Sequence, residues 1–143
     1  MELSESVSER IDFYASEGND FYDDDRNLEA IESWMKGVDL LPEPNNQWDA
    51  YGWFMASIGD AYYFEEDYDR SKQALMNALN SEEGRENPLV HYRLGQCEIE
   101  LGNEDKGIES LLKAYMLDGE SIFELDGEDG AFYLNLIKKN VRL

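Results

Sequence analysis

Apolar residues recur at intervals of three and four along most of the chain, the spacing that places them on one face of an α-helix. Few stretches show the strict two-residue alternation of a half-buried strand. Prolines, glycines and Asn-Pro or Gly-Asn pairs separate the periodic stretches, and Asn87 before Pro88 fits a capped first helical turn. We therefore predict an all-α chain with helices over 5–24, 27–41, 47–65, 68–81, 88–101 and 104–117.

The predicted helices share one template of small and large residues. Twelve residues after a glycine stands a small residue, four further on a large apolar one, and three further on another small one. Small side chains let two antiparallel helices cross closely, and large ones fill the space beside the crossing. The three copies are Gly18, Ala30, Trp34 and Gly37; Gly59, Ser71, Leu75 and Ala78; and Gly95, Gly107, Leu111 and Ala114.

These spacings resemble the tetratricopeptide repeat, whose signature is an aromatic residue, Leu-Gly, Tyr, and then Ala, Phe and Pro. The matching residues are Tyr14, Glu17, Gly18, Phe21, Ala30, Trp34 and Pro42; Met55, Ile58, Gly59, Tyr62, Ser71 and Leu75; and His91, Leu94, Gly95, Glu98, Gly107 and Leu111. Glu17 and Glu98 depart from the signature, which has Leu and Tyr in those places. The resemblance implies a single α-solenoid domain of three helix pairs, with repeats over about 11–44, 52–85 and 88–121.

The segments outside the template are loops and a cap. The glycines lie 41 and 36 residues apart, further than the family's repeat length of about 34, so we expect longer loops at 41–48 and 81–87. Residues 122–143 fit no fourth unit. We predict that they form a capping helix over the apolar face of the last repeat.

The chain is strongly acidic. Its 33 Asp and Glu against 12 Lys and Arg leave a net charge of −21. This charge repels phosphate backbones and anionic lipids, so we predict no nucleic-acid or membrane partner and favour a basic or amphipathic protein, although solubility explains the acid equally well. A single cysteine, the absence of a signal peptide and the absence of an apolar run of ~18 residues predict a cytoplasmic location.

Candidate catalytic chemistry is sparse. His91 and Cys97 are six residues apart, about 240° around one helix, so they cannot pair from that helix, and we predict packing roles for both. The acidic runs at 20–25 and 126–130 lack the spacing of an EF-hand and are predicted to be solvated turns rather than calcium sites. We therefore predict no catalytic, metal or cofactor residue and no enzyme activity; a carboxylate- or metal-dependent hydrolase is the remote alternative.

A protein-binding surface is the better supported function, because the resemblance implies that the first helix of each repeat lines a concave groove. Some of its aromatic residues are expected to pack between helices instead. The family's carboxylate clamp needs several Lys, Arg and Asn residues, of which only Arg93 and Asn19 stand in matching places, so an anionic peptide end is not the predicted ligand. The implied groove residues are Asp12, Asn19, Tyr22 and Asp23; Trp53, Ala56, Asp60, Tyr63 and Phe64; and Leu89, Tyr92, Arg93, Gln96 and Glu100.

The resemblance also carries an expectation about biological role. Short, acidic, stand-alone chains of this repeat look like bacterial proteins that accompany secreted polymorphic toxins, which implies an immunity protein that neutralises a toxin domain. The alternative is an adaptor or chaperone that holds a segment of a client protein. A toxin-encoding neighbouring gene would separate the two roles.

Overall fold

The structure is a computed structural model and describes residues 2–143. Within that range the chain forms helices and no strand, so the all-α prediction is confirmed. The elements are α1 (Glu5–Asp23), α2 (Asn27–Asp39), the 3₁₀ helix η1 (Asn45–Gln47), α3 (Asp49–Phe64), α4 (Tyr68–Ala78), α5 (Glu82–Glu86), α6 (Pro88–Glu100), α7 (Glu104–Asp118), the 3₁₀ helix η2 (Ser121–Asp126) and α8 (Glu128–Asn140).

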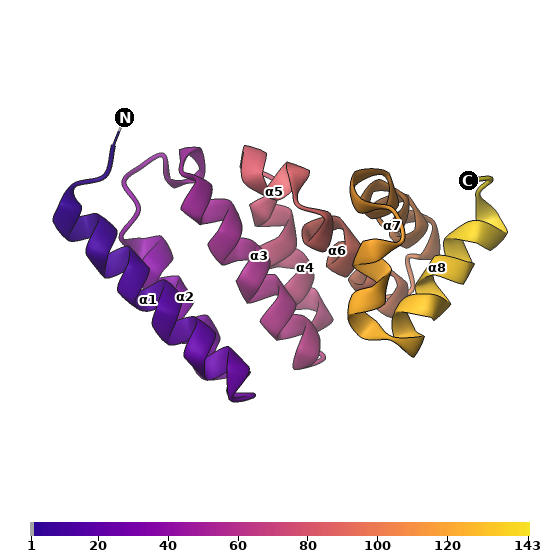
Figure 1. Ribbon diagram of the computed structural model, residues 1–143, viewed down its shortest axis with the longest axis horizontal. Coiled ribbons are helices and arrows are strands. Elements are labelled where there is room, and N and C mark those ends of the chain that lie inside the picture. Colours follow the sequence, from indigo (N-terminus) through magenta and orange to yellow (C-terminus); the bar gives the residue numbers. More distant parts are fainter. Residues whose placement is uncertain (1) are drawn as a thin grey trace.

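Three helix pairs follow one another along an elongated molecule whose termini lie at opposite ends (Figure 1). The pairs are α1 with α2, α3 with α4, and α6 with α7, and α2 and α4 carry the contacts to the next pair. The segment η2–α8 packs against α6 and α7 and closes the C-terminal end. The predicted α-solenoid of three helix pairs with a C-terminal capping helix is confirmed.

Each pair crosses where the template places a glycine. The glycine of the first helix faces the large apolar residue of the second, in the pairs Gly18 with Trp34, Gly59 with Leu75 and Gly95 with Leu111. A Cβ atom on Gly59 would lie only 2.6 Å from Leu75 Cδ2, so no side chain fits there without moving the helices apart. The small residues of the template therefore set the distance between paired helices.

The turn inside each pair also repeats. A residue with positive φ stands seven positions after each template glycine: Asp25 at 60°, Glu66 at 59° and Gly102 at 88°. This left-handed conformation is free of cost for glycine and costs other residues roughly 1–2 kcal/mol. The first two turns thus carry backbone strain that the third avoids.

The segment between α4 and α6 differs from the predicted loop, because residues 82–86 form the short helix α5. Ser81 caps it by accepting a hydrogen bond from the backbone N–H of Gly84 at 3.1 Å, and two glutamates in its first turn suit the positive end of a helix. The next helix begins as expected: Asn87 accepts from the N–H of Leu89 at 3.0 Å, and Pro88 is the first residue of α6.

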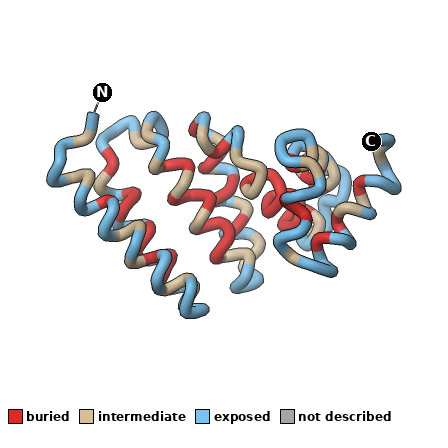
Figure 2. The backbone as a smooth tube through the Cα atoms, in the orientation of Figure 1, coloured by how far each residue is buried: buried red, intermediate tan, exposed pale blue. Residues whose placement is uncertain are grey.

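The core has two parts. The larger runs through α1 to α4 and one side of α6, and buried residues are densest on α3 and α6 (Figure 2). The smaller lies under the cap, where Tyr92 and Leu111 pack with Phe123, Tyr133 and Ile137. No helix of the described chain combines the length and apolar character needed to cross a membrane.

The lone histidine and cysteine are both packing residues, as predicted. His91 is 7% exposed, and its Nε2 lies 2.8 Å from the carbonyl oxygen of Arg85. Cys97 is fully buried, and its thiol donates to Ser71 Oγ at 3.2 Å. Burial raises the pKa of the Cys97 thiol to about 11, so the reactive thiolate is scarce at neutral pH.

Candidate functional site

A buried arginine on α6 lies at the centre of the predicted groove residues. Arg93 is 3% exposed; its Nε donates to Asp60 Oδ1 of α3 at 2.5 Å, and its Nη1 donates to Asp126 Oδ2 of η2 at 2.6 Å. Burial alone would lower the pKa of Arg93, but the two carboxylates raise it above its ordinary value. The guanidinium is therefore a permanent charge that two distant parts of the chain neutralise.

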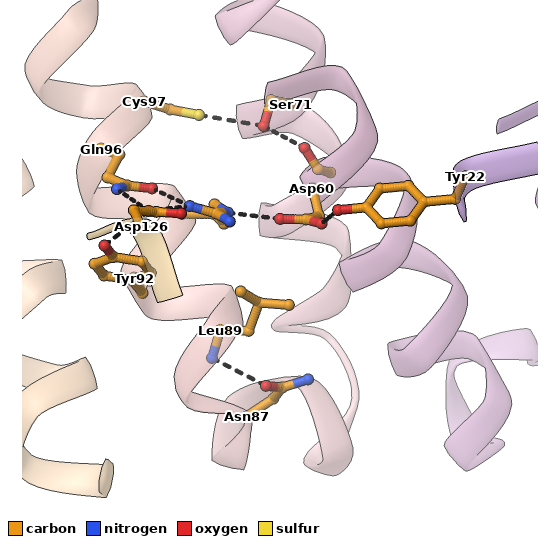
Figure 3. Close-up of polar contacts among 11 residues, drawn as sticks. Tyr22, Asp60, Ser71, Asn87, Leu89, Tyr92, Gln96, Cys97 and Asp126 are labelled. Atoms are coloured by element: carbon orange, nitrogen blue, oxygen red, sulfur yellow. Dashed lines mark hydrogen bonds and ion pairs between the residues drawn. The ribbon is translucent and has the colours of Figure 1, made fainter. Parts of the chain in front are cut away.

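Further donors complete this arrangement. The hydroxyl of Tyr22 on α1 donates to Asp60 Oδ2 at 2.5 Å, while Tyr92 and Gln96 Nε2 donate to Asp126 Oδ2 at 2.8 and 3.0 Å. Burial and the adjoining carboxylates raise the pKa of both phenols, which keeps them protonated donors at neutral pH. Figure 3 shows Tyr22 and Asp60 on one side, with Asp126, Gln96 and Tyr92 on the other. We call these residues the polar network: Tyr22, Asp60, Tyr92, Arg93, Gln96 and Asp126.

The carboxylate of Asp126 is held in its charged form. Burial by itself would raise the pKa of this group, but hydrogen bonds from Arg93, Gln96 and Tyr92 outweigh it and hold the pKa below its usual value. The result is an anion, supplied by the capping segment, that is fixed against α6.

Aromatic rings surround the guanidinium. Its central carbon lies 4.8 Å from the ring centroids of both Tyr63 and Phe64 on α3, and 5.3 Å from that of Tyr92. Rings at this distance stabilise a cation through their negative faces. Tyr63 is half-buried and Phe64 is 48% exposed, so the α3 rings form the solvent side of the network.

An open hollow of about 230 Å³ lies between α1 and α3. Exposed Asp12 and Asn19 stand on it, and half-buried Trp53 packs edge-on against Trp34 and Phe54 with centroids 6.1 and 5.2 Å away. We call it the α1–α3 hollow. It is lined by Ile11, Asp12, Ala15, Asn19, Ala50, Trp53 and Phe54.

Two parts of the chain match a known protein family. Residues 54–84 and 89–121 match the family model described as tetratricopeptide repeat. These two segments are tetratricopeptide repeats. A comparison with curated proteins gives no match.

Solved structures with this repeat arrangement share the fold at low sequence identity. The first tetratricopeptide domain of Spaghetti (RPAP3), bound to the HSP90 peptide SRMEEVD, is 16% identical with a TM-score of 0.69, covering 93% of this chain and 96% of that one. MamA is 18% identical with a TM-score of 0.65, covering 90% and 77%. The Yersinia enterocolitica type III secretion translocator chaperone SycD is 15% identical with a TM-score of 0.73, covering 98% and 100%.

The repeat protein brings most of its expected groove residues together, in two places. Asp12, Asn19 and Trp53 line the α1–α3 hollow. Asp23 and Glu100 are exposed at the ends of α1 and α6, while Ala56 is buried and Leu89 partly buried. The residues gathered around the guanidinium are Tyr22, Asp60, Tyr63, Phe64, Tyr92, Arg93 and Gln96.

The third repeat departs from the expectation of an open groove. Tyr92 and Gln96 are fully buried and Arg93 nearly so. The reason is the capping segment: Phe123 and Tyr133 pack against Tyr92, with ring centroids at 5.1 and 6.5 Å, and Asp126 takes the hydrogen bonds that a ligand could have used. A partner reaches these residues only if η2 moves away.

Asp126 is the important residue that sequence reasoning missed. The run 126–130 reads as a solvated turn, and nothing local distinguishes its first residue. The available signal lay elsewhere: Arg93 sits on an otherwise buried helix face, and a buried guanidinium requires carboxylate partners. Across residues 2–143, no three His, Cys, Asp or Glu side chains gather into a group that could hold a metal ion.

Proposed function

We propose that this protein is a non-catalytic binding module that holds a basic or amphipathic segment of another protein against α1 and α3. The α1–α3 hollow carries the proposal. Its walls supply apolar contact from the partly exposed Trp53, Ala15 and Ala50, and the Asp12 carboxylate stands at its edge. An aromatic anchor beside an acidic rim suits a segment with an apolar side chain next to a lysine or arginine.

The charge of the first helices supports a basic rather than an acidic occupant. The RPAP3 domain is bound to an acidic peptide, SRMEEVD. In this chain, Arg93 is the cation among the expected groove residues, and Asp60 and Asp126 already neutralise it. A net charge of −21 adds long-range attraction for a basic partner and repulsion of an acidic one at this face.

Two biological roles fit this binding mode. In the immunity role, the occupant is the basic face of a toxin domain, and the acidic surface speeds its capture; the net charge of −21 supports this role. In the adaptor or chaperone role, the occupant is a segment of a client protein; similarity in fold to the secretion chaperone SycD supports this one. Both use the α1–α3 hollow, so one set of variants tests the shared proposal.

The test begins with affinity capture and mass spectrometry, followed by calorimetry with the purified partner. Asp12→Lys reverses an exposed charge with little risk to folding, and Trp53→Ala removes the anchor. Each is expected to weaken binding by about tenfold or more, while Phe132→Ala, an exposed aromatic on α8, leaves the affinity unchanged. A toxin domain as partner, whose activity the protein blocks, selects the immunity role, and a client that is kept soluble selects the chaperone role.

Thermal melting keeps the outcome interpretable, since Trp53 also packs against its neighbours. If Asp12→Lys and Trp53→Ala both melt like the wild type and both bind with wild-type affinity, the α1–α3 hollow is not the interface. The proposal is then wrong in both of its forms.

A further inference from the structure

A second concave surface lies between α4 and α7. It consists of two adjoining hollows of about 270 and 440 Å³ that share Leu79 at the end of α4. Along α7 the lining residues Lys106, Ser110, Lys113 and Leu117 are four, three and four positions apart, so they form one stripe facing α4. We call this surface the α4–α7 furrow. Lys72, Met76 and Leu79 form the opposite wall.

The walls of the furrow expose large apolar side chains. Met116 is 75% exposed, and Met76 and Leu117 are each 47% exposed. Methionine side chains are flexible and polarisable, and they occur often at surfaces that adapt to a partner. An apolar stripe inside a concave surface is a feature of docking sites rather than of scattered exposed residues.

The floor of the furrow holds a buried carboxylate that lacks a full set of partners. Glu98 is 3% exposed; Lys72 Nζ lies 2.5 Å from its Oε1, and Oε2 has no hydrogen-bond partner among residues 2–143. Glu98 stands where the repeat signature has a tyrosine. Lys72 therefore offsets the buried charge of Glu98 and is not a cation that a partner could use.

The furrow also reverses the sign of the local charge. Its lining contains Lys72, Arg85, Lys106 and Lys113 against Glu98 and Glu109, in a chain with net charge −21. Each carboxylate has a neighbouring cation that offsets its charge, Lys72 for Glu98 and Lys113, at 3.7 Å, for Glu109. Arg85 and Lys106 make no ion pair within the part of the chain that the structure describes. These two cations are available to a partner.

We propose that the α4–α7 furrow binds an acidic amphipathic helix of a partner protein. The stripe from Lys106 to Leu117 covers about 16 Å at 1.5 Å per residue, which is three turns of a bound helix. Apolar side chains of that helix would enter between Met76, Met116 and Leu117, as in other helix-in-groove complexes, and flanking carboxylates would pair with Arg85 and Lys106. The furrow shares no lining residue with the α1–α3 hollow, so the two sites can be filled together.

The test uses two synthetic, fluorescein-labelled peptides of about 14 residues, long enough for three to four turns. One carries leucines at positions four, three and four apart with glutamates on both sides; the other has the same composition in scrambled order. The protein variants are Arg85→Glu with Lys106→Glu in the furrow, and Lys36→Glu with Lys139→Glu as a control with an equal change of net charge. All four residues are exposed, so folding should not be affected.

Fluorescence anisotropy should show the striped peptide binding the wild type about tenfold or more tightly than the scrambled peptide. The furrow variant should lose about tenfold in affinity, and the control variant should stay within about twofold of wild type. Met116→Asp should also abolish the preference for the striped peptide. Its melting temperature is a check on folding, since Met116 is mostly exposed.

Three results would overturn the proposal. One is the absence of binding by the striped peptide. Another is an equal loss of affinity for that peptide in the furrow variant and in the control variant. The third is a wild-type dimer, seen by sedimentation, that Met116→Asp converts to a monomer, because a second copy of the chain would then be the occupant. The α1–α3 hollow is untouched by these variants, so failure here leaves the function proposed above intact.

Discussion

Arg93 of α6 and Asp126 of η2 are 33 residues apart in the sequence and 2.6 Å apart in the structure. This ion pair fixes the capping segment against the first helix of the third repeat. It also removes that repeat from the open groove that the family resemblance implies. The α1–α3 hollow stays accessible on the first helices, so the same contact both completes the fold and restricts where a partner can bind.

Replacement of Arg93 by methionine should destabilise the protein strongly. The substitution leaves buried Asp60 and partly buried Asp126 without their cation, at a cost of about 3–5 kcal/mol, which lowers the melting temperature of a chain of this size by about 10 °C. Circular dichroism during heating measures the change. Arg70→Met is the control, because its pair with Asp67 at 3.5 Å is exposed and worth at most about 1 kcal/mol. Equal melting of both variants would contradict the role given to Arg93.

The pH dependence of stability should report on Asp126. Its pKa is held below the value of about 3.9 that an unfolded aspartate has, so its contribution is complete above that value and is lost as the pH falls through the lower, folded value. Asp126→Asn should therefore be less stable than wild type at pH 7, and the gap should narrow towards pH ~2. Urea unfolding at a series of pH values measures this. A difference of constant size across this pH range would show that the charge of Asp126 does not contribute to stability.

The strained turn after α3 offers a stabilising substitution. Glu66 has a φ of 59°, which glycine adopts freely, so Glu66→Gly should raise the free energy of unfolding by up to about 1 kcal/mol. Glu65 is the matched control: it is the adjacent glutamate and has a φ of −82°. Glu65→Gly should lower stability, since glycine there only adds freedom to the unfolded chain. Destabilisation by both substitutions would refute the strain at Glu66.

The helix crossing at Gly59 should tolerate no large side chain. Leu75 Cδ2 lies 2.6 Å from where a Cβ would stand, so Gly59→Leu must separate α3 from α4, at a cost of about 1–3 kcal/mol or more. Differential scanning calorimetry should show a lower melting temperature. Gln73→Leu, on the exposed side of α4, adds a similar side chain without a crossing and should melt within a degree or two of wild type. The opposite order of melting temperatures would disprove the crossing.

The fold was predictable because its rules are local and repeat. Gly59 and Leu75 belong to the two helices of one pair, so their spacing alone places them at a crossing, and Asn87 with Pro88 marks a helix start directly. The contact of Arg93 with Asp126 was not predictable in this way. It depends on the path that the cap takes after α7, which no periodic pattern encodes. The α1–α3 hollow was predictable in part. The family resemblance supplied Asp12, Asn19 and Trp53, but only the structure showed that the capping segment closes the groove at the third repeat.

The polar network has a consequence for how the molecule opens. Repeat arrays are held by nearest-neighbour contacts, and their ends usually fray independently. Here Tyr22 belongs to the first pair, Asp60 to the second, Arg93 to the third and Asp126 to the cap. Detachment of either end leaves a buried charge or donor unmatched near the middle of the chain. Amide hydrogen exchange in α1 and α8 should therefore follow the global opening of the array, and the protein should unfold as a single cooperative unit rather than from its ends.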